Sequence, residues 1–293
     1  MIPAALRSEI EAHVGPIEHA EPLGGGSIAS AFRLDTSRGR YFFKHAGGTA
    51  GASFEAEAEG LSALASAAEG TGVRVPRVLH ARNRHERPGL LLLEWIPVGR
   101  ADPGYFRRFG EALARLHRKA APGDAWGFPT DNFIGATPQE NGWTSEWPTF
   151  FRERRLLPQI ELARRKHRWE ANWDRPAERL LQRLDSLLPP APERSLLHGD
   201  LWSGNHLPGA DGAPWLIDPA TYVGHREADL AMTELFGGFS PSFYDAYQAA
   251  WPLEPGYPER REIYNLYHLL NHLNLFGGSY AHSVERILRR FGG

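Results

Sequence analysis

The apolar and polar positions of the first 95 residues predict a small sheet with two helices. Apolar residues recur at helical spacing between residues 4 and 14. Short runs rich in apolar and aromatic residues, bounded by turn residues, predict strands over 17–23, 28–34, 40–45, 78–80 and 90–95. Ser53 suits the N-cap of a second helix through residue 64, which carries Glu residues near its start.

From residue 96 onward the pattern is mostly helical. The helical spacing of the apolar residues is regular over 106–116 and from 227 to the C-terminus, and less regular over 150–162. Short strands are predicted around 196, 207 and 215–217. Residues 95–99 read W-I-P-V-G and break the pattern, as a hinge would. The sequence therefore predicts an α+β chain of two lobes, with a small antiparallel sheet plus helix in residues 1–95 and a larger, mainly helical lobe in residues 96–293.

Composition narrows the class of protein. A chain of 293 residues with 42% hydrophobic residues can bury the cores of two lobes. A net charge of −2 argues against a nucleic-acid partner held by bulk electrostatics. The absence of Cys makes a disulfide-linked dimer impossible and fits an intracellular protein. No apolar run approaches the roughly 18 residues of a membrane span, and the start does not resemble a secretory signal, so we expect a cytoplasmic protein with no membrane partner.

The segment H-G-D-L-W-S-G-N at residues 198–205 carries the strongest chemical signal. It holds a D-x-x-x-x-N pair, Asp200 and Asn205, and Asp218 follows thirteen residues later behind an apolar run. In phosphoryl transfer, one Asp accepts the proton of the acceptor hydroxyl, while an Asn and a later Asp hold the Mg²⁺ that neutralises the phosphates of ATP. The spacing predicts a kinase with Asp200 as the base and Asn205 and Asp218 as Mg²⁺ ligands, since both offer hard oxygen atoms.

Two other residues of this segment suggest further roles. His198 is expected to bond the backbone of the loop and hold its shape. Trp202 lies inside the predicted catalytic loop, where its ring could flank a substrate ring.

Lys44 supplies a second, independent part of the pattern. It is one of only three lysines among 33 basic residues, and it lies in a predicted strand about twenty residues after a glycine cluster. A lysine that reaches ATP phosphates from a strand behind a glycine-rich loop is the arrangement of kinases. Glu57, on the next helix, is the predicted partner of Lys44, with Glu55 and Glu59 as alternatives on the same helix.

The glycine cluster itself predicts a loop over the nucleotide. Glycines permit a tight turn whose backbone N–H groups approach phosphate oxygens closely. A serine that follows them adds a hydroxyl donor. The residues concerned are Gly24, Gly25, Gly26 and Ser27.

Two other functions compete for the same residues. A metallohydrolase could use His198, Asp200, His206 and Asp218 as ligands of a metal pair, but no H-E-x-x-H or comparable spacing occurs, and Lys44 is left unexplained. His268 and His272 lie four residues apart on a predicted helix and could also bind a metal, but no carboxylate stands at a spacing that would complete such a site. A nucleotide-binding pseudoenzyme is the other alternative, and the complete set of catalytic residue types argues against it.

With these residues in hand, the chain resembles the fructosamine kinases, a branch of the aminoglycoside-phosphotransferase and protein-kinase-like superfamily. The resemblance covers nearly the whole chain. Its motifs are G-G-G-S-I at 24–28, F-E-A-E at 54–57, N-F-I-G at 132–135, T-P-Q at 137–139, H-G-D-L-W-S-G-N at 198–205, D-P-A at 218–220 and Y-V-G-H-R-E-A-D-L-A-M at 222–232.

This resemblance implies a two-lobed protein-kinase-like fold and an activity. The activity is ATP- and Mg²⁺-dependent phosphorylation of the 3-hydroxyl of a ketosamine, either small or bound to a protein. The 3-phosphate makes the adduct unstable, so that the amine is released and the protein repaired. Another small-molecule kinase of the same fold, acting on an aminoglycoside, choline-like compound or sugar, is the alternative.

The resemblance also implies further site residues. The residues that would border the adenine are Glu94, Trp95 and Ile96, and the residues on the substrate side are Trp202, Asn132 and Thr137. One departure concerns Ser27, where many relatives carry a Cys that can support a redox-controlled dimer. A chain without Cys lacks this switch.

Overall fold

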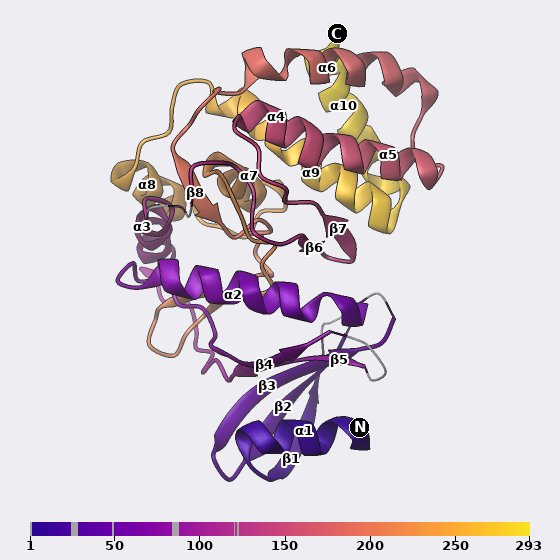
Figure 1. Ribbon diagram of the computed structural model, residues 1–293. Coiled ribbons are helices and arrows are strands. Elements are labelled where there is room, and N and C mark those ends of the chain that lie inside the picture. Colours follow the sequence, from indigo (N-terminus) through magenta and orange to yellow (C-terminus); the bar gives the residue numbers. More distant parts are fainter. Residues whose placement is uncertain (1, 25–28, 49, 84–87, 120, 122) are drawn as a thin grey trace.

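The N-terminal part is built on an antiparallel sheet of five strands (Figure 1). The computed structural model describes all residues except 1, 25–28, 49, 84–87, 120 and 122. The strand order is β1-β2-β3-β5-β4. The strands are β1 (Ile17–Leu23), β2 (Ser30–Thr36), β3 (Gly39–Ala46), β4 (Val78–Arg82) and β5 (Gly89–Glu94), and the helices are α1 (Ala4–Val14) and α2 (Phe54–Ala68). These elements follow the predicted order, and each boundary lies within a few residues of the prediction.

The two faces of this sheet are covered by different helices. Leu90 and Leu92 of β5 pack in one cluster with Leu6 and Ile10 of α1. Leu91 and Leu93 belong instead to the large core, together with residues of α2. Successive strand residues point to opposite faces, so a run of four leucines serves both helices at once.

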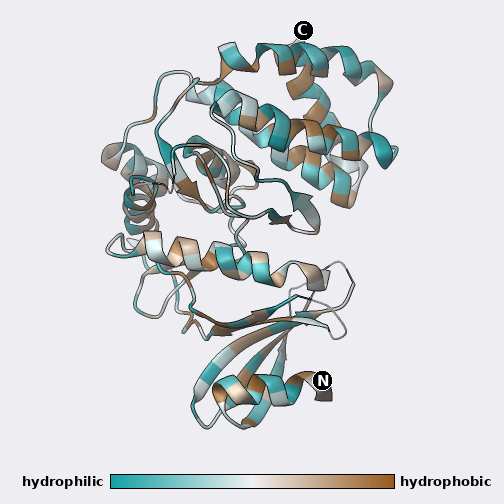
Figure 2. Cartoon of the chain, viewed as in Figure 1, coloured by the Kyte–Doolittle hydropathy of each residue, from teal (hydrophilic) through white to brown (hydrophobic). Residues whose placement is uncertain are grey.

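The C-terminal part is mainly helical. Its helices are α3 (Tyr105–His117), α4 (Trp147–Phe151), α5 (Leu157–Arg165), α6 (Asp174–Leu187), α7 (Glu227–Leu235), α8 (Pro241–Ala250), α9 (Tyr257–Phe276) and α10 (Ala281–Gly292). Hydrophilic and hydrophobic colours alternate along the outer helix α6, which buries Leu180 and Leu184 on one side and exposes polar residues on the other (Figure 2). Among the described residues, none of the helices has the length and apolar character needed to cross a membrane.

Three short two-stranded antiparallel sheets lie between these helices. They are β6 (Asn132–Ile134) with β7 (Thr137–Gln139), β8 (Arg194–Leu197) with β11 (Tyr222–His225), and β9 (His206–Pro208) with β10 (Pro214–Leu216). The prediction included β8, β9 and β10 but missed β11 and the β6–β7 hairpin, because strands of three or four residues are too short to show a period.

The irregular spacing over 150–162 has a structural cause. Between α4 and α5 the chain forms a π-helical turn, Arg152–Leu156. Such a turn inserts an extra residue into the helix and shifts every following residue around the axis. The apolar positions on either side therefore cannot share one 3.6-residue period.

The connecting segment is bonded within the C-terminal part, and helix α2 of the N-terminal part contacts that part as well. Beyond residue 95 the chain joins the β9–β10 hairpin, where the Gly99 N–H donates to the Pro208 carbonyl at 2.8 Å and the Ala210 N–H donates to the Pro97 carbonyl at 2.6 Å. Helix α2 lies between the sheet and the C-terminal part (Figure 1). Its Glu59 accepts a bond from the Thr130 hydroxyl at 2.5 Å. The division into lobes at residue 95 stays a proposal.

Candidate active site

Lys44 joins three distant segments of the chain. Its ammonium on β3 lies 2.9 Å from the Glu57 carboxylate on α2 and 2.8 Å from the carboxylate of Asp218. Burial alone would lower the pKa of Lys44, but the two adjacent carboxylates raise it above its usual value, so the ammonium stays charged. Burial raises the pKa of Glu57, and Lys44 only partly offsets that effect.

The structure also distinguishes Glu57 from its two alternatives. Glu59 is engaged with Thr130, and the Glu55 backbone N–H donates to the side-chain oxygen of Asn83. Of the three glutamates, Glu57 is the one placed against Lys44.

Asp200 and Asn205 are bonded to each other within the loop after β8. The Asn205 amide donates to the Asp200 carbonyl at 2.9 Å, to the Asp200 carboxylate at 3.2 Å and to the Asp218 carbonyl at 3.5 Å. Burial, aided by the negative charge of Asp218, raises the pKa of Asp200 to about 7. The bonds of Asn205 use its NH₂ group, so its side-chain oxygen can face a cation.

His198 shapes this loop, as its expected role requires. Its Nε2 donates to the Ile217 carbonyl at 2.9 Å, and its Nδ1 accepts the backbone N–H of Asp200 at 3.2 Å. Burial lowers the pKa of His198, which favours the neutral ring that these two bonds need. The Ala220 N–H donates to the His198 carbonyl at 2.9 Å, so the segment around Asp218 is fastened to the loop on both sides.

Asp218 holds an unusual backbone conformation. Its φ is 51°, in the left-handed region that residues with a side chain seldom adopt. Holding a non-glycine residue there costs on the order of 1–3 kcal/mol. The flanking bonds to the catalytic loop keep it in place.

Asp229 is a site residue that the sequence analysis did not single out. Its carboxylate on α7 is 1% exposed and accepts the backbone N–H groups of His198 at 2.7 Å and Gly199 at 2.8 Å. It also accepts from Nε2 of His117 on α3 at 3.2 Å, and His117 Nδ1 pairs with the Tyr247 hydroxyl at 2.9 Å. Burial would raise the pKa of Asp229, but the hydrogen bond and charge of His117 lower it overall. The catalytic loop is thus anchored from behind by a buried charge.

The sequence did contain a weak signal for this anchor. Asp229 lies within the motif at 222–232 and on a predicted helix, where an acidic residue is usually exposed. Its buried position comes from tertiary contacts, namely its bonds to His117 of α3 and to the backbone of the loop.

The substrate-side residues occupy different environments. Trp202 is 39% exposed, and its indole lies over Gly204, where a methyl carbon on residue 204 would meet the ring at 2.4 Å. Asn132 and Thr137 are both buried. Asn132 donates to the Thr221 carbonyl and accepts from Gln139, which also donates to the Ala220 carbonyl. These contacts let the β6–β7 hairpin brace the segment after Asp218, and direct substrate contact by Asn132 or Thr137 stays a prediction.

The predicted nucleotide-side residues are described only in part. Glu94 ends β5 and accepts the Arg77 N–H at 2.8 Å, while Trp95 and Ile96 follow in the connecting segment, with Ile96 buried. Gly24 is exposed just after β1. Gly25, Gly26 and Ser27 lie outside the described residues.

The residues that could hold a metal are oxygen donors. Asn205 and Asp218 supply two hard ligands, which suits a Mg²⁺ ion that takes its other ligands from phosphates and water. Within the described part of the chain, no group of three or more His, Asp or Glu side chains is arranged to hold a metal by itself.

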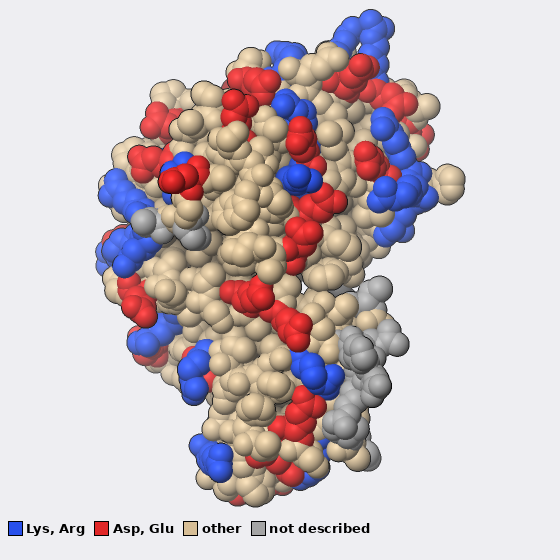
Figure 3. Space-filling view, viewed as in Figure 1, with Lys and Arg blue, Asp and Glu red and all other residues tan. Residues whose placement is uncertain are grey.

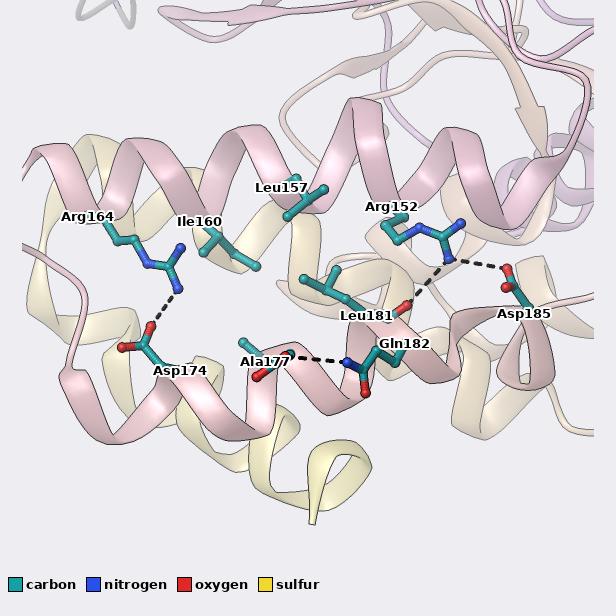
Figure 4. Close-up of a pocket in the computed structure, with 10 residues that line it drawn as sticks. Arg152, Leu157, Ile160, Arg164, Asp174, Ala177, Leu181, Gln182 and Asp185 are labelled. Carbon is teal, nitrogen blue, oxygen red and sulfur yellow. Dashed lines mark hydrogen bonds and ion pairs between the residues drawn. The ribbon is translucent and has the colours of Figure 1, made fainter.

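Charges elsewhere on the molecule are largely paired with one another. Acidic and basic side chains are interspersed on the face shown in Figure 3. A groove between α5 and α6 is spanned by the ion pairs Arg164–Asp174 at 2.5 Å and Arg152–Asp185 at 3.3 Å (Figure 4). Because the charged side chains that span this groove are paired with one another, we assign no ligand to it.

We expect that Asp218→Gly and Asp218→Ala both abolish phosphoryl transfer, but that the Gly variant unfolds at higher denaturant concentration. Both remove the carboxylate, and only Gly relieves the left-handed backbone, which favours it by about 1 kcal/mol. Equilibrium denaturation in urea measures the difference. Equal stability of the two variants would contradict the claim that the backbone of residue 218 is strained.

We expect Asp229→Asn to lower kcat by about 100-fold while the KM for ATP changes little. The amide turns an N–H donor toward a backbone N–H and shifts the catalytic loop, and a shift near 1 Å costs about that factor. Steady-state kinetics provides the measurement, with Asp245→Asn on α8 as the matched control. A rise of the KM for ATP by a similar factor would show that the substitution disturbs the nucleotide site as well, and the thermal unfolding curve checks that the variant is folded.

A family model and curated relatives match almost the whole chain. The model of the fructosamine kinase family matches residues 3–291. A protein of Synechocystis sp. named "probable ketoamine kinase" is 43% identical over 276 residues, which cover 94% of this chain and 90% of that protein. The chloroplastic protein-ribulosamine 3-kinase of Arabidopsis thaliana is 39% identical over 267 residues, covering 91% of this chain and 80% of that protein.

Solved structures share the fold. A crystal structure from Thermobifida fusca, assigned as a fructosamine-3-kinase, superposes with a TM-score of 0.85 at 31% identity and covers 97% of each chain. An aminoglycoside phosphotransferase superposes with a TM-score of 0.65 at 13% identity, covering 97% of this chain and 98% of that chain. The predicted protein-kinase-like α+β fold is therefore confirmed.

Proposed function

The chain belongs to the fructosamine kinase family, and from this premise we propose that it transfers the γ-phosphoryl group of ATP to the 3-hydroxyl of a ketosamine. The names of its relatives, ketoamine kinase and protein-ribulosamine 3-kinase, support this class of acceptor. The observation that carries the proposal is the joined set of Lys44, Asp218, Asn205 and Asp200, which contact one another across β3 and the catalytic loop.

Asp200 is the proposed base. Its carboxylate orients the acceptor hydroxyl and takes the proton as the hydroxyl oxygen bonds to the γ-phosphorus. The bond from that phosphorus to the bridging oxygen breaks, and ADP leaves. The raised pKa of Asp200 makes its carboxylate a stronger proton acceptor than an exposed one.

The nucleotide would be held by residues from both parts of the chain. Lys44 would bind phosphate oxygens with its direction fixed by Glu57, and Glu94, Trp95 and Ile96 would border the adenine. A kinase of this fold uses ATP with a divalent cation, and we assign that cation as Mg²⁺ held by Asn205 and Asp218. When bound, it would neutralise phosphate charge. The glycine loop at residues 24–27 would cover the phosphates.

The product suggests a repair role. Phosphorylation at the 3-hydroxyl would make the adduct unstable and release the free amine. For a sugar attached to a protein lysine, this amounts to deglycation.

We expect a coupled ATP-consumption assay with Mg²⁺ to show turnover of ribulose-lysine or fructose-lysine but not of an aminoglycoside. Asp200→Asn should lower kcat by about 10²–10⁴-fold, because it removes the proton acceptor, and should leave ATP binding intact. Asp185→Asn, an exposed carboxylate on α6, serves as the control and should match the wild type. If the aminoglycoside alone is turned over, the ketosamine assignment is wrong, and the protein is another small-molecule kinase of the same fold.

We expect Gly204→Ala and Trp202→Ala to raise the KM for a ketosamine by similar factors, and the double variant to be no worse than either. The added methyl group at residue 204 meets the indole at 2.4 Å and displaces it, so both changes remove the same ring from the substrate. A double-mutant cycle on the KM for ketosamine measures this, with the KM for ATP as the internal control. Additive losses would show that Gly204 acts independently of Trp202.

A further inference from the structure

An aromatic surface lies exposed where α7 and α9 end. We use this name for Phe236, His272, Phe276 and Tyr280. The ring of His272 lies 4.8 Å from that of Phe236, 5.4 Å from that of Phe276 and 5.1 Å from that of Tyr280. Phe236 is 40% exposed and Phe276 is 64% exposed. Large aromatic groups left in water and clustered together mark a binding surface more often than scattered ones do.

This surface borders the catalytic loop. The turn after α7 carries positive φ values of 72° at Gly237 and 94° at Gly238, and a carbon added at Gly238 would lie 2.5 Å from Cβ of Ser203. Phe236 is two residues from that contact, a distance of about 7 Å along the chain at most. The neighbouring Trp202 is itself 39% exposed. Phe236 therefore lies close along the chain to a contact with the loop that carries Trp202, and these two residues with Phe276 are three of the five exposed large hydrophobic side chains in the described part of the chain.

The rings of the aromatic surface carry no charge of their own, and the cations Lys166 and Arg168 at this end of α9 are bonded to the Asn274 and Leu273 carbonyls. His272 Nδ1 donates to the His268 carbonyl at 2.8 Å, which leaves Nε2 as an acceptor in the neutral ring. Burial lowers the pKa of His272, in agreement with that tautomer. The faces of uncharged aromatic rings attract cations and pack well against methylene groups.

Resting on the proposed function, we infer that the aromatic surface binds the amine side of the ketosamine, namely its protonated secondary nitrogen and the alkyl chain behind it. The sugar must place its 3-hydroxyl at Asp200, so its nitrogen substituent has to leave the loop in another direction. A secondary alkylamine is cationic at neutral pH, which complements ring faces without a positive charge of their own. A lysine side chain adds four methylene groups that can lie along Phe236 and Phe276.

The test compares two adducts of the same sugar, one on methylamine and one on the side chain of Nα-acetyl-lysine. In the double variant Phe236→Ser/Phe276→Ser, we expect the KM for the lysine adduct to rise about tenfold and the KM for the methylamine adduct to rise about threefold or less. The kcat for both adducts and the KM for ATP should stay at wild-type values. The matched variant Phe236→Tyr/Phe276→Tyr keeps the ring faces and should retain the wild-type KM within about twofold.

The outcomes separate this inference from the proposed function. If the wild type phosphorylates both adducts and the Ser variant leaves both KM values unchanged, or raises them by equal factors, the inference is overturned and the function stands. If the wild type phosphorylates neither adduct, the proposed function fails and the inference with it. Because both phenylalanines are exposed, the Ser variant should fold, and its thermal unfolding curve checks this.

Discussion

The ion pairs of Lys44 are the constraint on which the rest of the site depends. One ammonium on β3 is held between Glu57 of α2 and Asp218, a residue 174 positions further along the chain. Taking such a charge out of water is costly unless it is paired, so Lys44 stays in place only while sheet, helix and catalytic segment keep their positions. Through these contacts one side chain relates the N-terminal sheet to the loop that carries Asp200.

A second buried charge supports the catalytic loop from the opposite side. Asp229 gathers two backbone N–H groups of the loop and the ring of His117, and so ties α7 and α3 to it. His198 and Asn205 add bonds within the loop and to the segment around Asp218. This dense bonding explains how Asp218 can keep a left-handed backbone that would relax in a looser environment.

The site therefore combines a rigid charged half with an open aromatic half. Phosphoryl transfer needs fixed charges, because its catalysis is mostly positioning and electrostatic stabilisation. Under the proposed function, recognition of an acceptor that carries a large amine would need a surface open to solvent, and the exposed Trp202 and the aromatic surface are the proposed candidates. The two halves meet at residues 202–205, where Gly204 makes room for the indole.

The sequence by itself determined the chemistry and most of the elements. The spacing of Asp200, Asn205 and Asp218, with Lys44 in a strand behind a glycine cluster, was enough to predict a kinase, because these signals are local and each depends on residue type. The tertiary structure places Glu57, the predicted partner, against Lys44. It alone decided that Asp229 is buried behind the loop and that Asn132 braces the segment after Asp218. Those facts depend on partners far apart in the chain, and no local period or propensity records which side chains packing will bring together.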